Sequence, residues 1–209
     1  MKSLFTVFVL LFTLTLTAQS KYEQGMAKAF TLWQEDKLDD AANLFERIAT
    51  AENEQWLPDY YVAQLYVLKC WNSWENRDEA ALKANLDKAQ EFVNNIKTKS
   101  KDEPYAKQMQ AQIYTVWVVH DGMKYGMKYS GKVAQLYNDA LEAQPENPIF
   151  IFNKAEWEIG AASFFGTPID AQCAAIQKAI ELFPTFKPES PFHPSEGLER
   201  AIKALEKCK

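Results

Sequence analysis

Two histidines, three cysteines and a tandem tetrapeptide are the residues of this sequence whose chemistry could define a site. His120 and His193 lie far apart, and neither shares a predicted helix face with a second metal ligand. Cys70, Cys173 and Cys208 include no Cys-x-x-Cys pair, so the spacing of a zinc or thiol-redox site is missing. The sequence shows no glycine-rich phosphate loop and no nucleophile elbow. We therefore predict no catalytic residues, no metal, no cofactor and no enzymatic activity.

The tandem tetrapeptide is the second feature. Residues 122–129 read Gly-Met-Lys-Tyr-Gly-Met-Lys-Tyr, with Ser-Gly-Lys following. This basic–aromatic loop consists of Lys124, Tyr125, Lys128, Tyr129 and Lys132. Lysines beside aromatic rings can bind an anionic or carbohydrate ligand. Glycines and long loops are equally typical of a flexible connector. We expect an exposed connection whose lysines face solvent.

The charge balance excludes one class of partner. The chain carries 23 Lys+Arg against 28 Asp+Glu, a net charge of −5, whereas a nucleic-acid binder needs a basic face. Acidic pairs such as Asp39-Asp40 are interpreted as solvated helix ends. The two carboxylates of a glycosidase need to be close only in space, so a hydrolase remains an alternative.

The first residues indicate the compartment. Lys2 precedes an apolar run from Leu4 to Leu16, and Thr17-Ala18 follows, which is typical of a secretory signal peptide cleaved after Ala18. The alternative is an uncleaved membrane anchor, but the run is shorter than the about 20 residues that span a bilayer. We expect residues 1–18 to be removed and the mature chain to be soluble, without a transmembrane span, in the periplasm or outside the cell.

Export changes the interpretation of the cysteines. One disulfide can form in an oxidising compartment, but the sequence does not choose the pair. Cys70 and Cys173 fall in apolar stretches, where a free thiol behaves as a small hydrophobic group. We expect these two to be buried free thiols and Cys208 to be exposed.

Apolar residues recur at helical spacing almost throughout the chain after residue 20. The spacing predicts antiparallel helix pairs at 22–35 with 38–51, 57–75 with 78–98, 104–119 with 131–143, and 149–164 with 169–183. Four prolines between 184 and 194 predict an extended segment. Ser195 should then cap a last helix that runs to about Cys208. The expected fold class is all-α.

Small residues recur in the first helix of each pair, at Ala29, Ala63, Ala111 and Gly160, where they should let neighbouring helices pack closely. The second helices carry Ala41-x-x-x-Phe45 and Val133-x-x-x-Tyr137, the latter with Pro145 closing the turn. These residues resemble the tetratricopeptide repeat, with its pattern W-x-x-L-G-x-x-Y…A-x-x-x-F…P. The tail at 187–194 resembles the ending of small exported bacterial tetratricopeptide-like proteins. The resemblance implies about four helix pairs in residues 19–185, with a proline-rich segment and capping helix in 186–209.

In tetratricopeptide-like arrays the first helices line a concave groove in which partners bind. The positions around each small residue then give a candidate groove: Met26, Phe30, Trp33, Tyr60, Gln64, Val67, Gln108, Gln112, Thr115, Trp157 and Phe164. Aromatic ends and a polar middle suit an extended peptide or a glycan, although Phe30 and Trp33 are equally expected in the core.

The function expected from these features is a non-enzymatic scaffold or adaptor that binds another envelope or secreted protein or peptide. The alternative is a binder, or a hydrolase, of a peptide or glycan that uses the groove or the basic–aromatic loop. Nucleic acid is not an expected partner.

Overall fold

The computed structural model describes residues 20–75, 78–101 and 103–208, and within these ranges it contains nine α-helices and no strand. The helices are α1 (Lys21–Gln34), α2 (Leu38–Ala51), α3 (Leu57–Asn72), α4 (Glu79–Lys99), α5 (Pro104–His120), α6 (Gly122–Ala143), α7 (Pro148–Phe165), α8 (Asp170–Leu182) and α9 (Leu198–Leu205). Short 3-10 turns follow α8 at Phe183–Thr185 and α9 at Glu206–Cys208. The predicted all-α fold class is confirmed.

Local sequence signals set the helix ends. The Ser20 hydroxyl accepts a hydrogen bond from the Glu23 backbone N–H, and the Glu23 carboxylate accepts one from the Ser20 N–H, which is a capping box. α3, α5 and α7 each have a proline in their first turn, where a backbone N–H has no partner within the helix anyway. α7 ends at Gly166, whose φ of 67° is left-handed.

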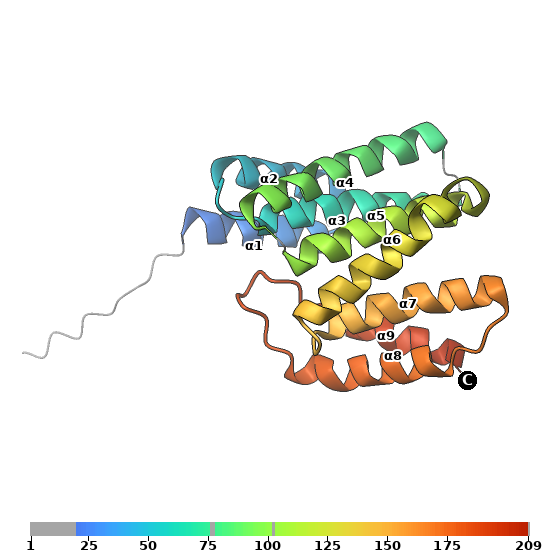
Figure 1. Ribbon diagram of the computed structural model, residues 1–209. Coiled ribbons are helices and arrows are strands. Elements are labelled where there is room, and N and C mark those ends of the chain that lie inside the picture. Colours follow the sequence, from blue (N-terminus) through green and yellow to red (C-terminus); the bar gives the residue numbers. More distant parts are fainter. Residues whose placement is uncertain (1–19, 76–77, 102, 209) are drawn as a thin grey trace, which may run out of the picture.

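Consecutive helices form stacked pairs. α1 packs on α2, α3 on α4, α5 on α6 and α7 on α8, while α2 and α5 each also contact α3. Figure 1 shows α1 to α5 above and α7 to α9 below, with α6 crossing between them. α9 packs on α8 and covers the end of the array, as predicted for a capping helix.

The beginning of α6 differs from the prediction. Residues 122–130 were expected to form a connection, but α6 begins at Gly122, directly after Asp121, whose carboxylate accepts a hydrogen bond from the Lys124 N–H. Glycine disfavours helix by about 1 kcal/mol per residue. Here the rings of Tyr125 and Tyr129 pack on α5, and this tertiary contact compensates.

The small residues behave unequally. Ala29, Ala63 and Ala111 are fully buried, which agrees with close packing at these positions. Gly160 is exposed, and a Cβ added there would meet nothing within 4 Å. The expected contact of Gly160 with a neighbouring helix is therefore wrong.

The C-terminal region brings two corrections. Cys173 is not a free thiol, because it forms a disulfide with Cys208, which ties the end of the chain to α8, whereas Cys70 is free and buried as expected. The last helix is capped by Gly197 and not by Ser195. Gly197 has a φ of 143°, and a Cβ there would lie 2.9 Å from the Phe183 ring, so both the backbone and the packing require glycine.

The proline-rich segment 186–194, which we call the strap, was predicted to be extended, but it bends and turns between 189 and 193, where the His193 N–H donates a 3.1 Å hydrogen bond to the Ser190 carbonyl. The strap reaches back to the first helices. The Phe192 ring stacks on Phe30 and meets Tyr22 edge-on, with centroid distances of 6.2 Å and 5.8 Å. The Tyr61 hydroxyl donates a 2.6 Å hydrogen bond to the Phe192 carbonyl. The strap thus links the C-terminal helices to α1 and α3.

Among the described helices, none combines the length and the apolar character needed to cross a membrane. The predicted signal peptide, residues 1–18, lies outside the described residues.

Candidate functional site

The predicted groove residues do not share one open surface. Met26, Tyr60, Val67 and Gln108 are buried in the core, and the Tyr60 hydroxyl donates a 3.3 Å hydrogen bond to the Gln108 side chain. Gln64, Gln112, Thr115 and Trp157 are half-buried, and only Phe164 is largely exposed. The buried members cannot contact a ligand, so the groove as predicted from the repeat pattern is not formed.

The aromatic end of that groove is part of the core. The Phe30 ring contacts Tyr61 and Phe45 at centroid distances of 4.7 Å and 5.2 Å, and Phe192 of the strap covers its remaining side. Trp33 packs on the Tyr61 ring at 6.1 Å. Phe30 and Trp33 were expected either in a ligand groove or in the core. The structure places both in the core.

The basic–aromatic residues lie on the first half of α6. Tyr129 stacks on Tyr114 of α5 at 4.4 Å and 12° between ring planes, and Tyr125 lies 4.8 Å from Trp117. Tyr125 and Tyr129 also stack on each other at 6.0 Å. These four rings, which we call the aromatic ladder, are partly buried and fix the rotation of α6 about its axis.

The lysines of this segment are exposed, as predicted. Lys124 lies 4.9 Å from the Tyr125 ring centroid and forms a 3.1 Å ion pair with Glu79 at the start of α4, and Lys128 lies over the Tyr129 ring. Hydrogen bonding to Tyr125 and to Glu79 raises the pKa of Lys124 above its ordinary value. Both ammonium groups therefore stay charged at neutral pH.

α6 and α7 pack together at one end and diverge at the other. Trp157 of α7 packs on a small hydrophobic cluster formed by Ala111, Val133 and Tyr137. Figure 1 shows the two helices separating toward the start of α6 and the end of α7. A Cβ added at Gly126 or at Gly160 would meet nothing within 4 Å.

These bare glycines mark the region that we call the α6–α7 opening. On the α6 side, Gly126 lies seven residues before Val133 and eleven before Tyr137, so helical spacing places it on the face that packs toward Trp157 farther along. On the α7 side, Gly160 and Phe164 lie three and seven residues after Trp157, again on one face. The α6–α7 opening is thus the exposed surface of the two helices beyond the contact that Trp157 makes.

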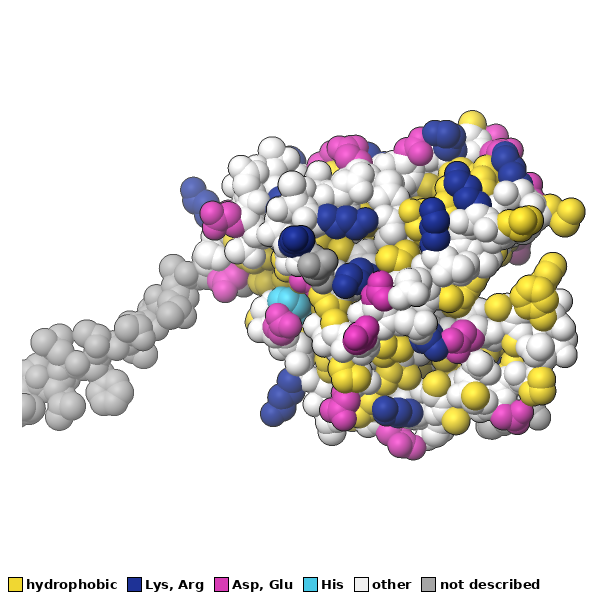
Figure 2. Space-filling view, in the orientation of Figure 1, with side chains coloured by type: hydrophobic (Ala, Val, Ile, Leu, Met, Phe, Trp, Pro, Cys, Tyr) yellow, Lys and Arg dark blue, Asp and Glu magenta, His cyan; other side chains and the backbone are white. Residues whose placement is uncertain are grey.

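Exposed hydrophobic side chains gather around this opening. Within the described residues, the exposed large hydrophobic side chains are Trp71, Val119, Met123, Met127, Phe164, Phe165 and Ile202. All except Ile202 lie at the end of α3, α5 or α7 or at the start of α6, and we call these six the apolar end. Phe164 and Phe165 are 82% and 75% exposed, and Figure 2 shows hydrophobic side chains projecting at the right-hand edge. Exposed apolar groups gathered in one place mark a binding surface.

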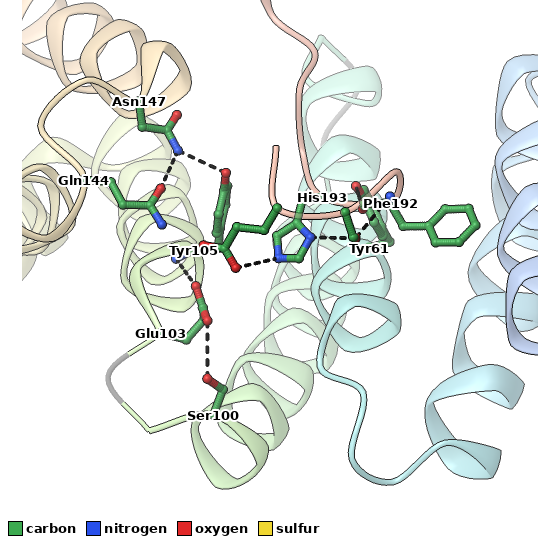
Figure 3. A network of polar contacts seen from close by, with 10 residues as sticks. Tyr61, Ser100, Glu103, Tyr105, Gln144, Asn147, Phe192 and His193 are labelled. Carbon is green, nitrogen blue, oxygen red and sulfur yellow. Dashed lines mark hydrogen bonds and ion pairs between the residues drawn. The ribbon is translucent and has the colours of Figure 1, made fainter. Parts of the chain in front are cut away.

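Residues of the strap form a polar network (Figure 3). A 2.7 Å hydrogen bond joins Nδ1 of His193 to the Ser190 hydroxyl. Nε2 of the same ring lies 3.6 Å from the Glu189 carboxylate. Trp56 and Tyr105 pack on the ring, and burial lowers the pKa of His193 below its ordinary value. These contacts hold the strap in place and leave the imidazole packed between protein groups.

Two cavities are present in the described part of the chain, away from the apolar end. A groove of about 830 Å³ between α2 and α4 has the Asp59–Lys99 ion pair in its wall, and Lys99 also donates to the Ala49 and Gln55 carbonyls. A hollow of about 690 Å³ lies between the α6–α7 turn and the strap. Among the described residues, no three His, Cys, Asp or Glu side chains gather as a metal site.

Most of the apolar end was not predicted from the sequence. Met123, Met127 and Phe165 were not candidates, and Gly126 and Gly160 were assigned to a connector and to a helix contact. The sequence did contain a signal for an amphipathic helix at 122–129. Gly-Met-Lys-Tyr repeats every four residues there, so on a helix each of the four residue types would form its own stripe. The doublet Phe164-Phe165 directly before a helix-ending glycine was a second signal.

No family model and no curated protein sequence matches this chain. Among solved structures, the fold is similar to that of the HusA haemophore from Porphyromonas gingivalis. The TM-score is 0.75, the alignment covers 92% of this chain and 94% of that chain, and the sequence identity is 18%. At this level of identity, the likeness shows a shared all-helical fold.

Proposed function

We propose that this protein is an exported, non-enzymatic binding protein that holds a flat, largely apolar ligand of the porphyrin class in the α6–α7 opening. The observation that carries the proposal is the apolar end, whose exposed Met123, Met127, Phe164 and Phe165 lie at the start of α6 and the end of α7. Exposed apolar side chains gathered in this way can cover the flat apolar face of a macrocycle. The structural likeness to a haemophore supports this ligand class.

The surroundings of the opening suit such a ligand. Trp157 beside the opening and Phe164 on α7 offer aromatic surface for stacking. Ligand sites are typically apolar with a few polar groups. The exposed residues of the apolar end would lose contact with water when a ligand fills the opening, and burial of apolar area contributes about 25 cal/mol per Å².

Export is part of the proposal. The predicted signal peptide at 1–18 and the disulfide between Cys173 and Cys208 point the same way, because disulfides persist in oxidising compartments. We place the mature chain in the periplasm or outside the cell, with a tetratricopeptide-like array at 19–185 and the strap and capping helix at 186–209.

A scaffold or adaptor that binds another envelope protein is the second candidate. Trp71 and Val119 favour it, because they are exposed at the same end but are not part of the opening. A protein partner would cover the whole apolar end, whereas a porphyrin would fill only the space between α6 and α7. The two functions therefore respond differently when the opening alone is blocked.

The test is a titration of the mature protein with haemin and with metal-free protoporphyrin IX, followed by quenching of tryptophan fluorescence and by the porphyrin absorption band. Gly126→Leu and Gly160→Leu place a side chain in the opening, and a Cβ at either position meets nothing within 4 Å. Each should weaken binding at least about tenfold, which corresponds to about 1.4 kcal/mol.

Gly131→Leu is the matched control. Gly131 also lies on α6 with nothing within 4 Å of its Cβ, but helical spacing turns it away from the face that carries Gly126. It should leave porphyrin binding unchanged. If the parent protein binds neither porphyrin, or if all three leucine variants bind as the parent does, the proposed function is wrong.

A further inference from the structure

The hydrophobic side chains of the apolar end project outward from the ends of different helices. Met123 and Met127 at the start of α6 are 94% and 101% exposed, and Phe164 and Phe165 at the end of α7 are also mostly exposed. The two cavities described above lie away from them. The apolar end is therefore a projecting surface, and a partner that covers it must accept side chains that point toward it.

Lysines accompany these side chains on α6. Lys124, Lys128 and Lys132 follow one another every four residues, so they form a stripe beside that of the methionines. Lys124 is paired with Glu79, whereas neither of the other two lysines forms an ion pair with a described residue. Figure 2 shows Lys and Arg side chains next to projecting hydrophobic side chains at its upper right. The apolar end is thus bordered by exposed positive charge.

The charge of the rest of the molecule has the opposite sign. The chain carries a net charge of −5, so an anionic surface repels most of it. The lysine stripe attracts such a surface at short range, within about a Debye length of 8–10 Å. The charge pattern therefore favours an anionic partner and turns the apolar end toward it.

A lipid bilayer meets both conditions. Its interface accepts projecting apolar side chains without a preformed hollow, and its anionic head groups attract lysines whose stems lie along the apolar surface. Trp71, at the end of α3, is exposed in the same region and lies 4.9 Å from Trp74. Tryptophan is enriched at membrane–water interfaces, where one side of the ring is apolar and the other is wet. A folded protein, in contrast, would need a hollow shaped to side chains from several helix ends.

We infer that the apolar end docks reversibly on the surface of a bilayer that contains anionic lipid. Phe164, Phe165 and the two methionines enter the boundary between head groups and acyl chains, and Lys128 and Lys132 contact the head groups. The docked protein stays peripheral, because only side chains at the ends of helices enter the lipid. This inference goes beyond the proposed function, since docking needs no porphyrin.

The experiment is flotation of the mature protein with vesicles, in the absence of porphyrin. One set of vesicles contains equal parts of phosphatidylglycerol and phosphatidylcholine, and the other contains phosphatidylcholine alone. We expect the protein to float with the anionic vesicles and to bind them at least about tenfold more tightly than the neutral ones. Binding to the anionic vesicles should weaken as the salt concentration rises.

Two double variants test the two contributions. Phe164→Ser with Phe165→Ser removes apolar side chains, and Lys128→Glu with Lys132→Glu reverses the charge of the stripe. All four side chains are exposed, so the melting temperature should stay close to that of the parent. Each double variant should bind the anionic vesicles at least about tenfold more weakly.

Matched controls make the same changes elsewhere. Lys178→Glu with Lys187→Glu gives the same change in net charge at exposed positions on α8 and the strap, and Ile202→Ser removes an exposed hydrophobic residue outside the apolar end. Both controls should float as the parent does.

Four results would overturn the inference. The parent could fail to float, or it could bind neutral and anionic vesicles equally. The phenylalanine variant could bind as the parent does, which would indicate attraction by charge alone. The control lysine pair could weaken binding as much as the α6 pair, which would indicate that net charge matters and its position does not. None of these results bears on porphyrin binding, which is measured without lipid, so the proposed function would stand or fall on its own titration.

Discussion

The ring of Phe192 stacks on the ring of Phe30 with 8° between their planes, although the two residues come from opposite ends of the described chain. Phe30 belongs to the first helix, and Phe192 belongs to the strap that precedes the last one. A stacked array of helix pairs usually contacts only its neighbours in sequence. Here the strap adds a direct connection between the two ends of the array.

The first prediction concerns this connection. Phe192→Ala removes the contacts with Phe30 and Tyr22 and should lower the free energy of unfolding by about 2 kcal/mol, less than a fully buried phenylalanine because Phe192 is only half-buried. Chemical denaturation measures the change. Phe165→Ala, at an exposed site, is the control and should change stability little. Equal effects of the two substitutions would show that the strap does not stabilise the array.

The second prediction concerns the cysteines. Cys173 and Cys208 are bonded across 35 residues, and burial raises the pKa of the Cys70 thiol to about 11. A thiol reagent should label nothing in the native protein, Cys70 after unfolding, and all three cysteines after unfolding and reduction. Cys173→Ser with Cys208→Ser should lower the free energy of unfolding by about 2–4 kcal/mol. Labelling of two further thiols before reduction would contradict the disulfide.

The third prediction is a pH dependence. Burial holds the pKa of His193 below 6.5, while the nearby Glu189 carboxylate acts in the opposite direction. The unfolded chain therefore binds a proton more readily than the folded one, and the free energy of unfolding should decrease as the pH falls from about 6.5. His193→Asn removes this group, so its stability should vary less than the parent's in that range.

The half-buried Glu103 carboxyl is a second titrating group near the strap. Burial raises its pKa above the ordinary value, so its protonation favours the folded state as the pH falls, which is the opposite sign from His193. The comparison with His193→Asn is needed for this reason, because both proteins keep Glu103. Parallel stability curves for the two proteins between pH 7 and 5 would contradict the role given to His193.

The helix pairs could be predicted from the sequence because apolar spacing alone decides which face of each helix is buried. α2 has the predicted bounds, α5 differs from its predicted bounds by one residue at one end, and α7 differs by one residue at each end. The start of α6 could not be predicted in this way. Its glycines disfavour helix locally, and its lysines, spaced four residues apart, repel one another on a helix. The compensating stacking of Tyr129 on Tyr114 is a contact between different helices.

The candidate site was harder to predict from the sequence than the helix pairs were. The predicted groove assumed that Phe30 and Trp33 stay uncovered, and no local pattern reveals that Phe192 of the strap covers Phe30. The opening depends on where α6 and α7 diverge, which the packing of Trp157 determines. The disulfide likewise depends on the fold, because spacing does not indicate which cysteines meet.

The last prediction uses the glycines, whose surroundings differ sharply. Gly126 and Gly160 are helical with open space around them, so Gly126→Ala and Gly160→Ala should each raise the free energy of unfolding by up to about 1 kcal/mol through better helix propensity. The repeat pattern predicted the opposite for a larger residue at Gly160, because it placed this position in a close helix contact. Gly197→Ala is the contrasting variant. Its φ of 143° and the Phe183 ring at 2.9 Å oppose a Cβ, so stability should fall. Thermal denaturation of the three variants decides the point: destabilisation at Gly126 or Gly160 would mean that α6 and α7 pack closely in solution and that the opening is not available to a ligand.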